Sequence, residues 1–232
     1  MLSNIARTSF GLLLVSGVVL VLGNRATAAN TERPGALPSP VVDEPLAQKK
    51  GEQTAVFAGG CFWGVQAVFQ HVKGVKSALS GYAGGKVVSP SYEQVSSGST
   101  GHAESVRVVY DPSQVTYGQL LRVFFSVAHD PTQLNRQGPD VGTQYRSAIF
   151  YSTDSQKRIA AAYVDQLTKA KSFSRPIVTE ISALERFNVA EDYHQDYATL
   201  HPYEPYIMFN DAPKVANLKR EFAALYVEPQ KR

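Results

Sequence analysis

The sequence contains one cysteine, Cys61, along with two methionines and one tryptophan in 232 residues. A single cysteine excludes an intramolecular disulfide and every metal site built from several thiolates. The five histidines form no HExxH motif and no close pair suited to zinc, so we expect no bound metal. Neither GxGxxG nor GxxxxGK[ST] occurs, so we expect no nucleotide or other cofactor.

A strong charge of either sign is also missing. The chain has 23 basic and 20 acidic residues and a formal net charge of +3, with 44% hydrophobic residues. This composition is typical of a folded globular protein. No basic stripe is available for a phosphate backbone, so we expect no nucleic-acid partner.

The N-terminal apolar run is too short to span a membrane. It extends over 13 residues from Phe10 to Leu22, after Arg7 and before the sequence Ala26-Thr27-Ala28. A membrane-spanning helix needs about 20 apolar residues, whereas a signal peptide needs about 7 to 15. We therefore predict a signal peptide over residues 1–28 and export, to the bacterial periplasm, with no membrane attachment after its removal. The alternative is an uncleaved N-terminal anchor.

Residues 29–53 are rich in proline and charged residues without apolar periodicity, which predicts a flexible leader. One domain follows over residues 54–232. Hydrophobic periodicity and capping residues predict its elements. We expect strands at 54–58, 76–82, 105–110, 147–152 and 177–182, and helices at 61–72, 117–128 and 154–171, with a last helix capped by Asp211. These patterns leave α/β and α+β architectures open.

Cys61 follows a short apolar run and the pair Gly59-Gly60, and apolar residues then recur at spacings of three and four. This pattern predicts a strand, a glycine turn and a helix that begins at Cys61. Unpaired N–H groups at a helix N-terminus lower the pKa of a thiol, and the thiolate is the nucleophile. We expect a reactive centre, with an inert buried cysteine as the alternative. Phe62 and Trp63 either wall an apolar pocket there or pack in the core.

Several segments resemble, in the same order, the motifs of one known family. They are GCFWG at 60–64, GYAGG at 81–85, YEQV at 92–95, GHAE at 101–104, QGPDVGTQYRS at 137–147 and EDYHQDY at 191–197. The chain thereby resembles the A-type peptide methionine sulfoxide reductases over about residues 54–209. The resemblance implies an α+β fold, a two-layer sandwich with a mixed sheet, a ferredoxin-like core and long irregular segments.

The resemblance also implies a reaction, the reduction of methionine-S-sulfoxide in oxidised proteins or peptides. Cys61 would attack the sulfoxide sulfur, and Glu104, kept protonated by an apolar setting, would protonate the oxygen. The other implied site residues are Tyr92 and Tyr145 as hydrogen-bond donors to the oxygen, Asp140 near the thiol, and Phe62, Trp63 and Tyr197 around the substrate. Without the resemblance, we would interpret Glu104 as a solvated charge in a loop, Asp140 as a turn-forming residue and the tyrosines as half-buried residues with a packing role.

The product of this attack would be a sulfenic acid on Cys61, which must be reduced again. Many members of the family use a second cysteine for this step, and this chain has none. We therefore expect an external reductant, either a small thiol or a thioredoxin-like protein.

Two other functions remain open. A papain-like thiol hydrolase could use Cys61 with His194, which lies 133 residues downstream, and Asn210 beyond it. A non-catalytic exported binding module could carry Cys61 as a buried, inert residue. Slow alkylation of Cys61 that occurs only at alkaline pH would favour the binding module.

Overall fold

A computed structural model describes residues 37–229. The predicted signal peptide and the first part of the predicted leader, residues 29–36, lie outside the described residues. The chain divides into a unit of residues 1–31 and a unit of residues 32–232, and everything below concerns the second unit. Within residues 37–229 no helix is long and apolar enough to cross a membrane.

The described residues form a mixed six-stranded sheet in the order β7-β6-β1-β3-β2-β8, in which only the pair β6 and β7 is parallel. Its strands are β1 (Gln53–Gly59), β2 (Val75–Ala83), β3 (Ala103–Tyr110), β6 (Ser147–Tyr151), β7 (Glu180–Ala183) and β8 (Phe187–Val189). A hairpin of β4 (Arg136–Gln137) and β5 (Asp140–Val141) stands apart from it. The α+β fold with a mixed sheet is confirmed.

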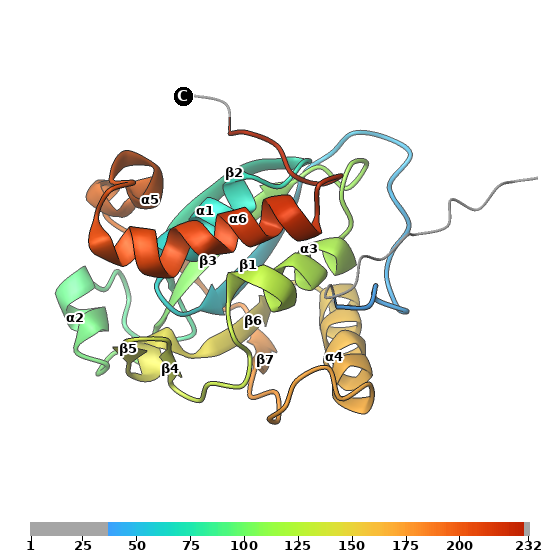
Figure 1. Cartoon of the computed structure of the whole chain (residues 1–232). Helices are drawn as coiled ribbons and strands as arrows, with labels where there is room; N and C mark the ends of the chain where they lie inside the picture. Colours follow the sequence, from blue (N-terminus) through green and yellow to red (C-terminus); the bar gives the residue numbers. More distant parts are fainter. Residues whose placement is uncertain (1–36, 230–232) are drawn as a thin grey trace, which may run out of the picture. The chain divides into compact units, whose positions relative to one another are not determined.

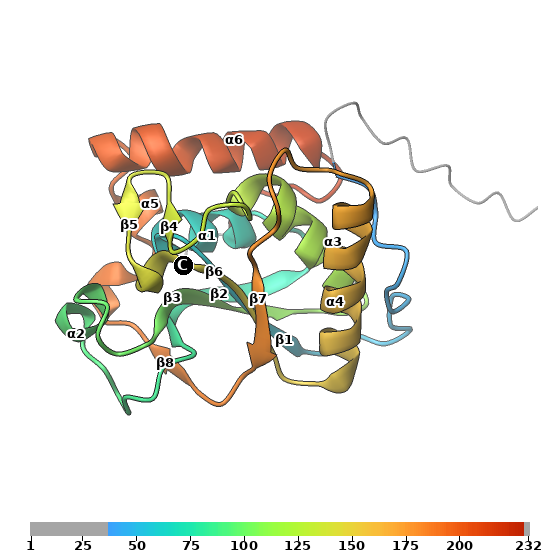
Figure 2. The same cartoon turned by 90° about the horizontal axis from the view of Figure 1, so that it is seen from below.

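Helices cover one face of this sheet (Figures 1 and 2). They are α1 (Phe62–Gln70), α3 (Tyr117–Val123), α4 (Asp154–Lys169) and α6 (Ala212–Glu221), while α2 (Tyr92–Ser96) and α5 (Tyr197–Leu200) lie in the connecting segments. Along β1, Ala55 and Phe57 join the core under the helices, whereas Val56 and Ala58 join a smaller cluster on the opposite face. This alternation is what a two-layer arrangement requires.

One predicted helix differs from the observed one, and one observed helix was not predicted. The predicted helix 117–128 is α-helical only to Val123 and continues as a π-helix over Phe124–Ala128. The predicted last helix, α6, begins directly after its predicted cap Asp211 and ends at Glu221, although the Asp211 side chain makes no capping bond and residues Ile207–Asp211 form a second π-helix before it. Between the predicted strands 76–82 and 105–110 the sequence analysis places no helix, but the structure contains α2 there. Ser91 and Gln94 form a reciprocal capping box at its N-terminus.

The second part of the predicted leader, residues 37–52, is held against the domain, so the expectation of flexibility is wrong there. Tyr163 of α4 donates its hydroxyl to the carbonyl of Pro38 at 2.8 Å. Asp43 accepts the backbone N–H of Gly118 at the start of α3 at 3.0 Å. The segment has no regular structure of its own, and composition alone could not reveal that helices elsewhere in the chain would satisfy its polar groups.

Candidate active site

Cys61 lies in the turn that joins β1 to α1. Gly60 has a φ of +88°, which a residue with a side chain rarely adopts, and an added Cβ would also clash with Gln137. Cys61 itself is the N-cap of α1 and is 8% exposed. The glycine pair therefore turns the chain so that the thiol sits at the N-terminus of the helix, as predicted from the sequence.

The prediction that the helix N-terminus lowers the pKa of the Cys61 thiol is wrong. Burial raises the pKa of Cys61 well above its ordinary value, and the nearby carboxyls of Glu104 and Asp211 raise it further. The backbone N–H of Trp63 and the ammonium of Lys214 act in the opposite direction and are outweighed. Slow alkylation at neutral pH is therefore expected of an enzyme with this site as well as of a binding module, and it no longer separates the two.

Glu104 faces the same turn from β3. Its Oε2 accepts the backbone N–H of Phe62 at 3.0 Å, and the side chain is 2% exposed. Burial raises the pKa of Glu104 to about 8, against the lowering effect of the Phe62 bond, and Asp140 and Asp211 raise it further. At neutral pH the group is mostly a neutral acid beside Cys61. The interpretation of Glu104 as a solvated loop charge is therefore wrong.

Two predicted tyrosines lie in the same electrostatic environment. Burial raises the pKa of Tyr92 and of Tyr145, and Glu104 and Cys61 add to both shifts. Both hydroxyls therefore stay protonated and can donate hydrogen bonds at neutral pH. The backbone N–H of Tyr92 donates to Glu191 at 2.9 Å, which anchors the start of α2 to the segment after β8.

Asp140 begins β5 and accepts a hydrogen bond from the hydroxyl of Tyr206 at 2.5 Å. Sequence reasoning missed Tyr206, whose ring meets Trp63 edge to face with centroids 6.0 Å apart. Burial, followed by the nearby Cys61, raises the pKa of its hydroxyl. No sequence signal distinguishes this residue among the 12 tyrosines of the chain.

Aromatic side chains enclose the site. Trp63 and Tyr197 stack with their centroids 3.9 Å apart and an angle of 12° between the ring planes. Phe62 is fully buried, and its ring lies 5.8 Å from that of Tyr82. The predicted substrate-binding residues are thus brought together, with Phe62 in the core and the Trp63–Tyr197 stack partly exposed.

Asp211 and Lys214, also missed, lie against the first turn of α1. Asp211 is fully buried and binds Lys214 at 3.1 Å, and a Cβ on Gly64 would collide with its Oδ1. The glycine that ends the GCFWG motif thus makes room for a buried carboxyl. Because Asp211 raises the pKa of both Cys61 and Glu104, the start of α6 influences the site from outside the motif segments.

His194 is not positioned as the base of a thiol hydrolase. Its Nδ1 accepts the indole N–H of Trp63 at 3.3 Å, and burial lowers its pKa. The Asn210 side chain, which would orient such a histidine, donates to the carbonyl of Tyr206 at 3.0 Å. His194 and Asn210 therefore make other contacts than those that a thiol hydrolase requires, and the geometry opposes the hydrolase hypothesis.

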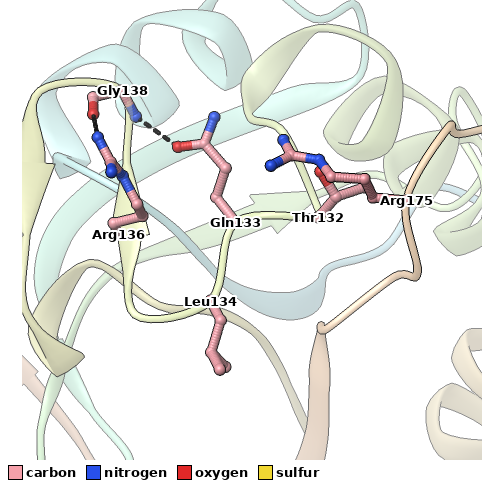
Figure 3. Close-up of a pocket in the computed structure, with 6 residues that line it drawn as sticks. All are labelled: Thr132, Gln133, Leu134, Arg136, Gly138 and Arg175. Atoms are coloured by element: carbon pink, nitrogen blue, oxygen red, sulfur yellow. Dashed lines mark hydrogen bonds between the residues drawn. The ribbon is translucent and has the colours of Figure 1, made fainter.

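A separate open hollow of about 530 Å³ lies beside the β4–β5 hairpin (Figure 3). Its lining residues are Thr132, Gln133, Leu134, Arg136, Gly138 and Arg175. Its polar groups bind one another, since Arg136 donates to the carbonyl of Gly138 at 2.8 Å and the N–H of Gly138 donates to Gln133 at 2.8 Å. No thiol or carboxyl group lines it, so it lacks the chemistry found at Cys61.

The fold and the site define a class of protein, an α+β domain with a buried thiol and a neutral carboxylic acid in one site. The aromatic side chains of Phe62, Trp63 and Tyr197 enclose this site, and we call them the aromatic wall. A family model described as peptide methionine sulfoxide reductase matches residues 53–225. The chain belongs to this family, as the sequence resemblance predicted.

Individual relatives agree with this assignment. The chain is 65% identical over 178 residues to peptide methionine sulfoxide reductase MsrA 2 of Mesorhizobium japonicum, which covers 77% of this chain and 91% of that protein. It is 50% identical to MsrA 2 of Synechocystis over 81% of this chain and 88% of that one.

Solved structures are similar as well. Reduced Mxr1 from Saccharomyces cerevisiae has a TM-score of 0.61 at 31% identity, covering 71% of this chain and 92% of that one. Methionine sulfoxide reductase A of Corynebacterium diphtheriae has a TM-score of 0.58 at 36% identity, covering 76% and 92%.

Proposed function

We propose that this protein reduces methionine sulfoxide in proteins and peptides to methionine, and so repairs oxidised proteins. The observation that carries the proposal is the arrangement at the start of α1. Glu104 accepts the N–H of Phe62, the residue directly after the buried Cys61, and has a pKa of about 8. An unprotonated oxide is a very poor leaving group, so a soft nucleophile needs a neutral acid beside it.

The reaction uses the site residues as follows. The Cys61 sulfur attacks the sulfoxide sulfur while Glu104 gives its proton to the sulfoxide oxygen, and the thiol proton restores Glu104. Tyr92 and Tyr145 donate hydrogen bonds to the oxygen as charge builds on it. The attack forms an S–S bond. The protonated oxygen is then transferred from the substrate sulfur to the Cys61 sulfur and the S–S bond breaks, so that methionine leaves reduced and Cys61 is oxidised to a sulfenic acid.

The substrate side chain lies against the aromatic wall. Phe62, Trp63 and Tyr197 present a flat apolar surface to the S-methyl group, and Asp140 with Tyr206 closes the side near the thiol. An apolar wall on one side and hydroxyl donors on the other distinguish the methyl from the oxygen. This supports selection of one sulfoxide epimer, which the family resemblance implies to be the S form.

Regeneration of Cys61 requires a thiol from outside, because the sequence has no second cysteine. One external thiol condenses with the sulfenic acid and releases water, and a second thiol then reduces the mixed disulfide. A thioredoxin-like protein or a small thiol can supply both.

The experiment that tests the function is a single turnover without reductant. We expect the folded protein, mixed with excess S-epimer methionine sulfoxide in a peptide, to form about one methionine per Cys61. A sulfenic-acid reagent is expected to label Cys61 in the same sample. If a folded protein with a free thiol forms no methionine, the proposal is overturned and the non-catalytic binding module is favoured instead.

We also propose that residues 1–28 are a signal peptide and that the mature protein works in the bacterial periplasm. The apolar run of 13 residues and the Ala26-Thr27-Ala28 sequence support this. N-terminal sequencing of the protein from cell fractions is expected to start near Ala29 in the periplasm. A retained Met1 in the membrane fraction would instead establish an anchor.

A further inference from the structure

The segment from Tyr197 to Phe209 has an unusual composition. Among its 13 residues Glu204 is the only acid, and neither lysine nor arginine occurs. Four of its large apolar side chains are exposed to solvent, among them Tyr203 at 87% and Phe209 at 78%. Leu200 and Met208 are exposed as well, and we call these four residues the apolar rim. Exposed apolar residues that gather in one surface segment are typical of interaction sites.

The segment that carries the apolar rim also reaches the active site. The ring of Tyr197, at the start of the segment, stacks on Trp63, and its centroid lies 4.3 Å from that of His201. Tyr206, inside the segment, contacts Trp63 and binds Asp140. Helix α5, which ends at Leu200, lies beside the beginning of α6 in Figure 1. The segment therefore connects the apolar rim to the aromatic residues of the site.

The segment is also internally bonded. The N–H of Glu204 donates to the carbonyl of His201 at 3.1 Å, and the N–H of Met208 donates to the carbonyl of Glu204 at 2.9 Å. Pro202 and Pro205 restrict the backbone between these bonds. A surface that is already ordered loses little conformational entropy on binding, so it can present apolar side chains to a partner at low cost.

We propose that the apolar rim binds the apolar residues that flank methionine sulfoxide in an unfolded or non-native polypeptide. This inference rests on the proposed function and names its preferred substrate. Methionine is mostly a core residue, so its neighbours in a damaged, opened protein are often apolar too. An extended chain advances about 3.3 Å per residue, so residues two or three positions from the sulfoxide reach beyond the Trp63–Tyr197 stack.

The test compares three substrates with dithiothreitol as the reductant. They are a peptide with Leu and Val on both sides of the sulfoxide, a peptide of equal length with Ser and Gly there, and N-acetyl methionine sulfoxide amide. The variant Y203S/F209S removes two rim side chains that face solvent, so its fold should persist. V41S, which changes an exposed residue in the segment 37–52, is the matched control.

We expect the unmodified protein to prefer the apolar peptide over the polar one by roughly tenfold in kcat/KM, mainly through KM. Y203S/F209S is expected to lose this preference and to keep its activity on the amide, while V41S keeps both. Equal rates on the two peptides, or an equal loss on all three substrates, would overturn the proposal. The assays are repeated with thioredoxin in place of dithiothreitol. If Y203S/F209S loses activity only with thioredoxin, the proposal is overturned too, and the rim is instead a binding surface for the reductant. Retained activity on the amide leaves the proposed function standing in every case.

Discussion

Cys61→Ser is expected to lower methionine formation by at least about a thousandfold, to the level of the uncatalysed reaction. A serine hydroxyl stays protonated at neutral pH and is a poor nucleophile for sulfur, and the described residues offer no second thiol because Cys61 is the sole cysteine of the chain. The measurement is methionine formed per protein in the single turnover. Measurable turnover by the serine variant would remove Cys61 from the proposed role.

Loss of activity must be separated from loss of fold in this variant. Cys61 is almost fully buried, so a serine there places a hydroxyl among apolar groups at a cost of about 1–3 kcal/mol. Urea denaturation of the variant measures this cost directly. A second control is the unmodified protein with Cys61 alkylated after slow reaction at high pH, which should be equally inactive.

Glu104→Gln is expected to slow the single-turnover rate by about 10²–10⁴-fold. The amide oxygen of glutamine can still accept the N–H of Phe62, so the geometry at the start of α1 is retained. The amide cannot give a proton to the sulfoxide oxygen, so only the acid is lost. Glu185→Gln, which changes an exposed glutamate, is the matched control and should react at the unmodified rate. An unchanged rate in Glu104→Gln would place the acid elsewhere.

The same variant should be more stable than the unmodified protein at alkaline pH. The pKa of Glu104 is about 8 in the folded state against 4.5 ordinarily, so the unfolded chain loses this proton at lower pH than the folded one. The free energy of unfolding therefore falls as pH rises from about 4.5 to about 8, and the buried acid contributes on the order of 3 kcal/mol to this fall between pH 5 and 8.

Urea denaturation of both proteins at pH 5 and pH 8 measures this difference. We expect the stability of Glu104→Gln relative to the unmodified protein to increase between these two pH values. A residue that weakens the fold and is needed for the reaction has a functional role, because packing alone does not explain its presence. A relative stability that stays constant with pH would show that Glu104 is ionised at neutral pH.

The local structure around the thiol was predictable from the sequence. A glycine pair after an apolar strand and apolar residues at helical spacing place Cys61 at the start of α1, as observed. The motif residues Glu104, Tyr92, Tyr145 and Asp140 were found through the family resemblance, since a lone glutamate or tyrosine carries no pattern of its own. The mixed sheet was likewise implied by the resemblance, because strand order depends on pairings that hydrophobic periodicity does not encode.

Other parts of the site depend on residues far apart in the chain. Tyr206 reaches Asp140 across 66 residues, and Asp211 packs against Gly64 from the start of α6. The segment 37–52 finds its partners on α3 and α4. None of these contacts is visible as a local pattern.

The sequence by itself determined the turn that presents the thiol and the presence of a single cysteine, from which we predict an external reductant. Only the tertiary structure decided the ionisation of the site. A helix N-terminus favours the thiolate, yet burial beside two carboxyls reverses the sign for Cys61 and makes Glu104 an acid with a pKa of about 8. Backbone conformation follows from a few neighbouring residues, whereas a pKa depends on every charge and every layer of protein that the fold brings around the group.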